Sequence, residues 1–135
     1  MNTKRFVIGS IVVFVCFQVL DFIFYGIILK GSLEAVPYLW RPDMAQKMWI
    51  MYLTGLAVSF LFVYIFIKGY ENKGLMEGLK YGIIVGLFMS IPACLSSYAL
   101  YPMPFSLAAK WFIVMMIEVV IGGLITAAVY KPKAA

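Results

Sequence analysis

The sequence predicts an all-α, polytopic membrane protein: one domain over residues 1–135, folded as an antiparallel bundle of four transmembrane helices. Of its 135 residues, 64% are hydrophobic and only 13% are charged, and the mean hydropathy is +0.98. Ordinary soluble domains are roughly 45–50% apolar and roughly 25% charged. A domain of this size leaves about a third of its unfolded surface exposed. This excess of apolar residues therefore predicts that lipid is the main solvent.

Long apolar runs predict the four helices, at residues 6–29, 48–67, 75–100 and 105–130. Each run holds at least about 20 residues, enough to cross a ~30 Å hydrocarbon core as a helix. The first run follows Lys4 and Arg5, as a signal peptide would. It is longer than a signal peptide and no small-residue cleavage site follows it, so we interpret it as a retained helix.

The basic residues predict the orientation. An even number of helices places both termini on one side, and lysine and arginine favour the cytoplasmic side. Seven lie on the side of the termini and four on the other: Lys4, Arg5, Lys68, Lys73, Lys80, Lys131 and Lys133 against Lys30, Arg41, Lys47 and Lys110. We therefore predict that both termini lie on the cytoplasmic side of the membrane. The chain's net charge of +5 then indicates contact with membrane lipids rather than nucleic acid.

The chain has two cysteines and no histidine. Imidazole ligation of haem or zinc and a histidine base are thereby excluded, and two cysteines alone do not make a metal site. Cys16 and Cys94 are expected at different depths, which predicts free thiols. A nucleophile–base pair or a metal set is not evident either. The sequence thus predicts no cofactor, no metal and no enzymatic activity.

Two acids interrupt the apolar runs. Asp21 lies nine residues before Lys30, or ~13 Å from the outer end, and Glu118 lies eight residues after Lys110, or ~12 Å from that end. A carboxylate at this depth costs several kcal/mol unless it is paired, hydrated or protonated, so both acids are functional candidates. Two carboxylates at one level repel each other, so we expect at least one to carry a proton at neutral pH.

Other polar groups fall near the same level. Together they form a candidate intramembrane polar site: Gln18, Asp21, Thr54, Ser90, Pro92 and Glu118. Pro92 belongs to it because proline frees a backbone carbonyl one turn earlier, near Phe88. Two interpretations stay open, since equal depth does not establish that side chains face one another. The acids either join helices as protonated polar groups, or they form a proton or cation site in a small transporter or channel.

Small residues recur every four positions along the third run: Gly74, Gly78, Gly82, Gly86, Ser90 and Cys94. Residues at i and i+4 share one helix face, and a stripe of small residues lets another helix approach closely. That helix belongs either to the same chain or to a partner, so a homo-oligomer and a larger membrane complex are both candidates. The stripe also supports an alternative function, that of a non-catalytic accessory or assembly subunit that docks other membrane helices.

The longest connection, residues 31–46, contains Trp40, Arg41 and Pro42. Pro42 restricts Arg41 to extended geometry, and Asp43 is placed to cap the second helix. Trp40 and Arg41 are candidates for a binding role because loops often carry function. The alternative is that they anchor the chain at the bilayer interface.

Short motifs stand near the ends of the predicted helices: Leu39-Trp40-Arg41-Pro42, Glu77-Gly78-Leu79-Lys80-Tyr81-Gly82, Trp111-Phe112 and Tyr130-Lys131-Pro132. With these motifs, most of the chain resembles a group of uncharacterised small bacterial membrane proteins with four helices. The resemblance implies a bacterial origin and this architecture. It implies no mechanism, because the group has no settled activity.

The layout is also similar to that of the small multidrug resistance exporters, four-helix proteins that carry one acid in the first helix and work as dimers. Asp21 occupies a comparable place. Glu118 has no counterpart in that family, the outer loop is longer here, and the family's aromatic motifs in the first helix are not recognisable.

Overall fold

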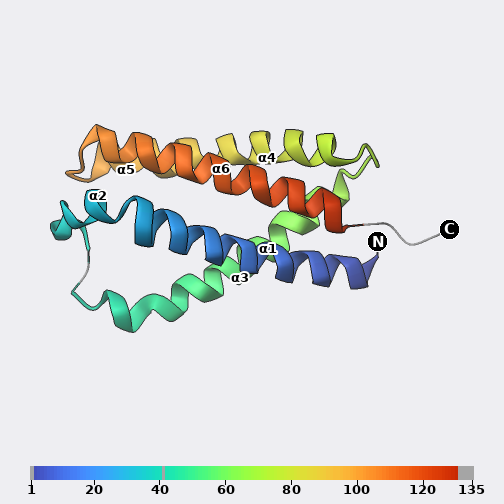
Figure 1. Ribbon diagram of the computed structural model, residues 1–135, viewed down its shortest axis with the longest axis horizontal. Coiled ribbons are helices and arrows are strands. Elements are labelled where there is room, and N and C mark those ends of the chain that lie inside the picture. Colours follow the sequence, from blue (N-terminus) through green and yellow to red (C-terminus); the bar gives the residue numbers. More distant parts are fainter. Residues whose placement is uncertain (1, 41, 131–135) are drawn as a thin grey trace.

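The computed structural model describes residues 2–40 and 42–130, and the regular elements in these ranges are all helical (Figure 1). The elements are α1 (Thr3–Ile23), the π-helical segment η1 (Phe24–Ile28), α2 (Lys30–Glu34), the 3-10 turns η2 (Pro37–Leu39) and η3 (Met44–Lys47), α3 (Met48–Lys68), α4 (Leu75–Ser90), the π-helical segment η4 (Ile91–Leu95), α5 (Ser96–Leu100) and α6 (Phe105–Val129).

Four continuous helical runs are long and apolar enough to cross a membrane: Thr3–Ile28, Met44–Lys68, Leu75–Leu100 and Phe105–Val129. These runs confirm the four helices that the sequence predicts. Two details differ. Much of the outer connection is helical, in α2, η2 and η3. Asp43 precedes η3 and makes no side-chain cap there, so the prediction that it caps the second long helix is wrong.

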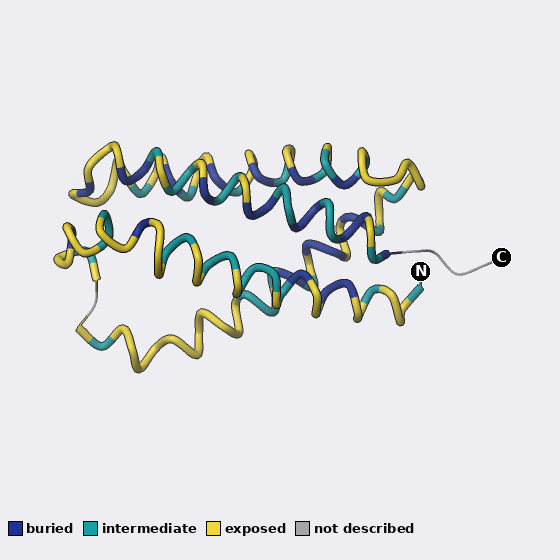
Figure 2. The backbone as a smooth tube through the Cα atoms, in the orientation of Figure 1, coloured by how far each residue is buried: buried dark blue, intermediate teal, exposed yellow. Residues whose placement is uncertain are grey.

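Figure 1 shows α4 and α6 side by side as an antiparallel pair, with α1 below them and α3 crossing α1. The start of α1 and the end of α6 lie at the same end of the molecule. Two hydrogen bonds join them there: the Asn2 amide donates to the Tyr130 hydroxyl at 3.3 Å and the Arg5 guanidinium donates to the Val129 carbonyl at 3.4 Å. At the other end α3 diverges from the bundle, and its first turns are exposed (Figure 2).

The stripe of small residues brings α4 against α6. Gly78, Gly82 and Gly86 are buried on this face. A Cβ on Gly82 would lie 2.7 Å from the Val120 Cα, and one on Gly78 would lie 2.6 Å from the Ala127 Cβ. Real Cβ atoms do not approach other atoms so closely, so only glycine permits this spacing of the two backbones. The helix that covers the stripe therefore belongs to the same chain.

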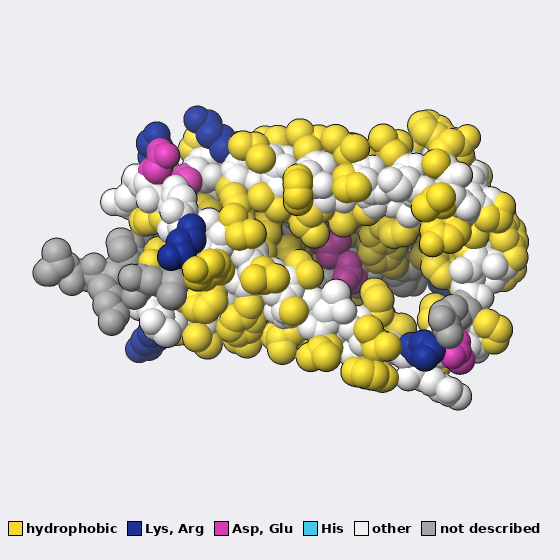
Figure 3. Space-filling model, turned by 180° about the vertical axis from the view of Figure 1, so that it is seen from behind, with side chains coloured by type: hydrophobic (Ala, Val, Ile, Leu, Met, Phe, Trp, Pro, Cys, Tyr) yellow, Lys and Arg dark blue, Asp and Glu magenta, His cyan; other side chains and the backbone are white. Residues whose placement is uncertain are grey.

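Most apolar side chains of the long helices point outward. Within the most apolar stretch of each run, the buried share is 17% for Thr3–Ile28, 22% for Met44–Lys68, 17% for Leu75–Leu100 and 39% for Phe105–Val129. Charged side chains gather mainly at the two ends, and an apolar band lies between them (Figure 3). A surface of this kind needs lipid or protein around it.

A carboxylate organises the loop between α3 and α4. Glu77 accepts hydrogen bonds from the backbone amides of Glu71 at 2.6 Å and Lys73 at 3.1 Å. Gly74 then enters α4 with a φ of 72°, a conformation that favours glycine. The loop is therefore held at the start of α4 by the first acid of that helix.

Candidate functional site

The carboxyl groups of Asp21 and Glu118 meet between α1 and α6. The two side chains lie within hydrogen-bonding reach of each other. Glu118 is only 7% exposed and Asp21 is half-buried. Ionised carboxylates only accept hydrogen bonds, so a bond between two carboxyl groups requires a proton on one of them. Two carboxyl groups this close to each other therefore favour a state in which one of them is protonated.

Local packing brings these two acids together. Gly122, one turn beyond Glu118, leaves room for the ring of Phe17, one turn before Asp21. A Cβ on Gly122 would lie 2.7 Å from the Phe17 ring. The Phe17 ring in turn packs edge-on against Phe62, with the ring centroids 5.9 Å apart. This contact sets the close approach of α1 and α6 at the level of the acids.

Two apolar clusters flank the acid pair, one toward each end of the bundle. On the side of the termini, the core consists of Val13, Phe62, Val63 and Val119. On the opposite side, it consists of Val36, Met103, Leu107 and Ala108, with Trp111 packed against it. Apolar side chains around a polar pair lower the local dielectric constant, which strengthens the interaction between its members.

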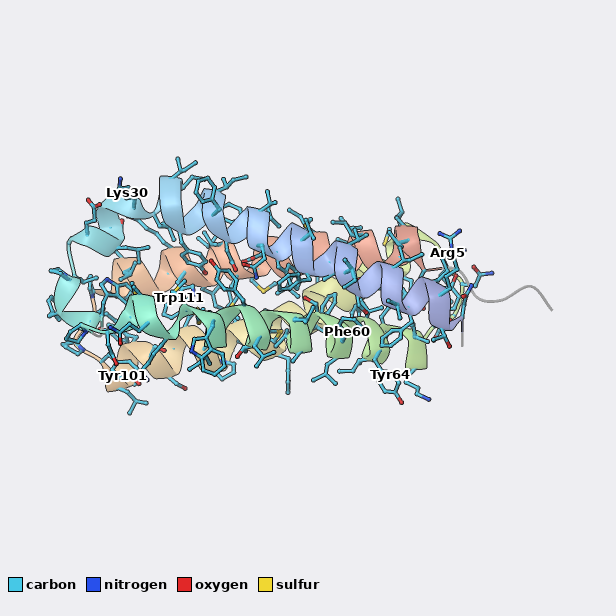
Figure 4. All side chains as sticks on the ribbon, turned by 90° about the horizontal axis from the view of Figure 1, so that it is seen from below. Arg5, Lys30, Phe60, Tyr64, Tyr101 and Trp111 are labelled. Atoms are coloured by element: carbon cyan, nitrogen blue, oxygen red, sulfur yellow. The ribbon has the colours of Figure 1, made fainter. Side chains whose placement is uncertain are left out.

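Tyr25 and Trp111 extend the polar site toward the outer end. The Trp111 indole lies beside the Tyr25 hydroxyl, and this hydroxyl lies within electrostatic reach of Asp21 and Glu118. In Figure 4, Trp111 lies inside the bundle, whereas Arg5 and Lys30 mark its opposite ends. We call Asp21, Tyr25, Trp111 and Glu118 the acid–tyrosine cluster.

Both π-helical segments of the described chain contribute to this region. Tyr25 belongs to η1, and Cys94, which is within electrostatic reach of Tyr25, belongs to η4. A π-helical segment adds one residue to the helical turn and shifts the directions of the side chains, and such segments are frequent at functional sites. In η4, Pro92 explains the irregularity, because proline cannot donate the regular helical hydrogen bond.

The other residues of the predicted polar site differ in their surroundings. Gln18 is half-buried against α3: its amide nitrogen would lie 3.1 Å from a Cβ on Gly55. Ser90 is fully buried, and its hydroxyl has no hydrogen-bond partner in the described structure. Thr54 and Pro92 are exposed. Residue counts give the height of a side chain along the bundle but not its rotation about the helix axis, which explains why some of these residues are buried and others are exposed.

Sequence reasoning did not include Tyr25 and Trp111 in the polar site. Tyr25 lies four residues after Asp21, and Trp111 lies seven residues before Glu118. Both spacings place a residue on the same helix face as the acid. A search for polar groups one or two turns from each acid would have found them.

The remaining sequence candidates have structural roles or lie outside the described residues. Cys16 and Cys94 are free thiols, as expected. Trp40 donates from its indole to the Leu33 carbonyl at 3.4 Å, which ties it to its own loop. Arg41 lies outside the described residues. Because α6 covers the stripe Gly78, Gly82, Gly86 and Ser90, an accessory subunit would have to dock its partners through another surface.

No cation neutralises the pair in the described part of the chain. The ion pairs there are Lys47 with Asp43 and Lys73 with Glu71, both in loops. Lys110, the basic residue of α6, donates instead to the Ser32 hydroxyl at 2.9 Å. Figure 3 shows acidic atoms in a hollow midway along one face, far from the charged ends. A proton or a cation is the charge that this arrangement of carboxyl groups can accept.

Comparisons with known proteins find no matching family model, no matching characterised protein and no matching solved structure.

Proposed function

We propose that this chain is a multi-pass protein of the bacterial cytoplasmic membrane that moves protons, alone or in exchange for another cation, through the Asp21–Glu118 pair. Its termini face the cytoplasm, where the basic residues of the sequence are more numerous. The protein acts as a small transporter or channel and not as an enzyme.

The close approach of the two carboxyl groups, with Glu118 buried, is the observation that carries this proposal. A purely structural polar contact between apolar helices is satisfied by neutral groups such as serine or asparagine. Two acids that share a proton can also lose it, and ionisable residues inside apolar helices line proton and ion pathways in pumps and transporters. The tyrosine hydroxyl beside the pair supplies a further group that donates and accepts protons.

Proton flux into vesicles tests the proposal. The purified protein is reconstituted into liposomes that enclose a pH-sensitive dye, and the outside is then acidified, with and without Na⁺ or K⁺ inside. We expect the pH gradient to collapse faster than in protein-free liposomes under at least one of these conditions. Rates equal to those of protein-free liposomes under all conditions would contradict the proposed function.

A further inference from the structure

The helix α3 changes its surroundings near Gly55. On the side of the termini, four of its residues are buried: Ser59, Phe62, Val63 and Phe66. Toward the outer end, residues 48–54 are all exposed, and we call them the outer arm of α3. Gly55 itself lies against α1, because a Cβ there would be 3.1 Å from the Gln18 amide nitrogen. The outer arm therefore begins where the last close contact with α1 ends.

Gly55 and Ser59 form a point at which α3 can bend. The Ser59 hydroxyl donates to the Gly55 carbonyl at 2.8 Å. A serine that bonds the carbonyl four residues earlier often bends its helix, and sharp bends are found at pairs of glycine and serine. Glycine also restricts the backbone least. The outer arm can therefore change its direction while the inner half of α3 stays packed.

The outer arm stands off from the rest of the bundle. In Figure 4, α1 and α3 diverge toward the outer end, and Trp111 lies between them. Figure 3 shows the hollow with acidic atoms beside the same part of α3. Asp21 is only half-buried, whereas the side toward the termini is closed by the buried cluster of Val13, Phe62, Val63 and Val119. The acid pair is therefore open toward the outer arm and closed toward the termini.

The outer arm carries a hydroxyl on the face that looks toward α4. Thr54 precedes Val58, Leu61 and Ile65 by four, seven and eleven residues, spacings that keep one helix face. Those three residues line the groove between α3 and α4. Thr54 is exposed in the structure. Because a hydroxyl without a partner is costly in an apolar medium, a partner for Thr54 would stabilise a different position of the arm.

The segment opposite Thr54 is η4. Phe62 and Phe66 of α3 both pack against Tyr81 of α4. Thr54 lies eight and twelve residues before these phenylalanines and Pro92 lies eleven residues after Tyr81, so the two come to about the same level in antiparallel helices. Pro92 has no N–H to donate to the carbonyl of residue 88, one turn earlier. A hydroxyl donor and a backbone acceptor thus lie on the two sides of the gap.

From the bend at Gly55, the gap beside the acid pair and the facing polar groups, we propose that the outer arm is a lid. It turns about Gly55 and closes against η4 over Asp21 and Glu118, and the Thr54 hydroxyl then donates to the Phe88 carbonyl. Burying a charge is costly, so closure is favoured when the pair is neutral. The lid rests on the membrane location and the acid pair of the proposed function, but its movement is measured without transport.

Distances between spin labels, measured by electron paramagnetic resonance in lipid nanodiscs, test the lid. The native cysteines are replaced (Cys16→Ala, Cys94→Ala), and labels are attached at Met51→Cys and Leu100→Cys, which are both exposed. We expect two distances for this outer pair. Combining Asp21→Asn with Glu118→Gln should raise the share of the shorter distance about twofold or more, because closure then buries no charge. A single distance, the same in both proteins, would overturn the proposal.

Two controls locate the hinge and the contact. An inner pair of labels at Leu61→Cys and Ile84→Cys, also exposed, should give one distance that the amide variants do not change. If it shows the same two distances, the whole of α3 moves and no lid turns about Gly55. Thr54→Val keeps the shape of the side chain but removes the hydroxyl, so it should lower the share of the shorter outer distance, whereas Thr54→Ser should retain it. An unchanged share in Thr54→Val would overturn the assigned contact.

The same measurements separate the lid from the proposed function. Two outer distances without proton flux in liposomes would support the lid and contradict the proposed transport. Flux with a single outer distance would support the transport and overturn the lid.

Discussion

Replacing Gly82 by leucine is expected to separate α4 from α6 and to leave little stably folded protein. The Cβ alone would lie 2.7 Å from the Val120 Cα and 3.1 Å from the Val119 carbonyl oxygen, and both of these are backbone atoms that cannot rotate away. Overpacking of a well-packed core typically costs about 1–3 kcal/mol, and more where a backbone must shift. A leucine at this position should exceed that range. The measurement is the denaturant midpoint of the purified protein in detergent.

Gly31→Leu is the matched control for this prediction. Gly31 is also helical, in α2, but a Cβ there would meet nothing within 4 Å. Its midpoint should remain close to that of the wild type. Gly82→Ala should fall between the two, because it adds the Cβ without the rest of the side chain. If Gly82→Leu unfolds at the same denaturant concentration as Gly31→Leu, α4 and α6 do not pack as described.

Asp21→Asn and Glu118→Gln are each expected to abolish proton flux while the fold is retained. An amide keeps the size of the carboxyl group and can donate a hydrogen bond to the remaining carboxylate, so the contact between α1 and α6 survives without a shared proton. An amide N–H does not ionise near neutral pH, however, so the amide cannot pass a proton on. Flux in the liposome assay should therefore fall to the protein-free rate. The free energy of unfolding, measured by denaturant titration, should change by no more than about 1 kcal/mol.

Glu34→Gln controls for the loss of one negative charge. Glu34 is an exposed acid at the end of α2, outside the long helices, so its amide variant should conduct like the wild type. Tyr25→Phe tests the neighbouring hydroxyl and should slow the flux without abolishing it. Wild-type flux in both Asp21→Asn and Glu118→Gln would mean that the acid pair is a structural contact and that protons cross elsewhere.

The sequence predicts the helices and their relative heights well, because these depend on local properties. Apolar runs between basic residues set the bounds of the four helices, and the constant rise of a helix predicts that Asp21 and Glu118 share a level. The structure has both carboxyl groups at that level and in contact. The four-residue period of the small residues similarly predicts the packing face of α4.

The rotation of each helix about its own axis could not be predicted, because it depends on contacts between helices far apart in the sequence. Thr54 has the same height as the pair but is exposed on α3. The π-helical segments η1 and η4 shift the register further, and they bring Tyr25 and Cys94 to the same region. The identity of the helix over the glycine stripe was open for the same reason. In the structure, α6 covers Gly78 and Gly82.

The central claim is that Asp21 and Glu118 share a proton between α1 and α6. Infrared difference spectroscopy of the protein in lipid nanodiscs tests this claim most directly. A protonated carboxyl group absorbs at a carbonyl frequency well separated from that of carboxylates. We predict a protonated carboxyl band in the wild type at pH 7, its persistence in Glu34→Gln, and its loss when Asp21→Asn and Glu118→Gln are combined. A wild-type spectrum at pH 7 without such a band would contradict the account.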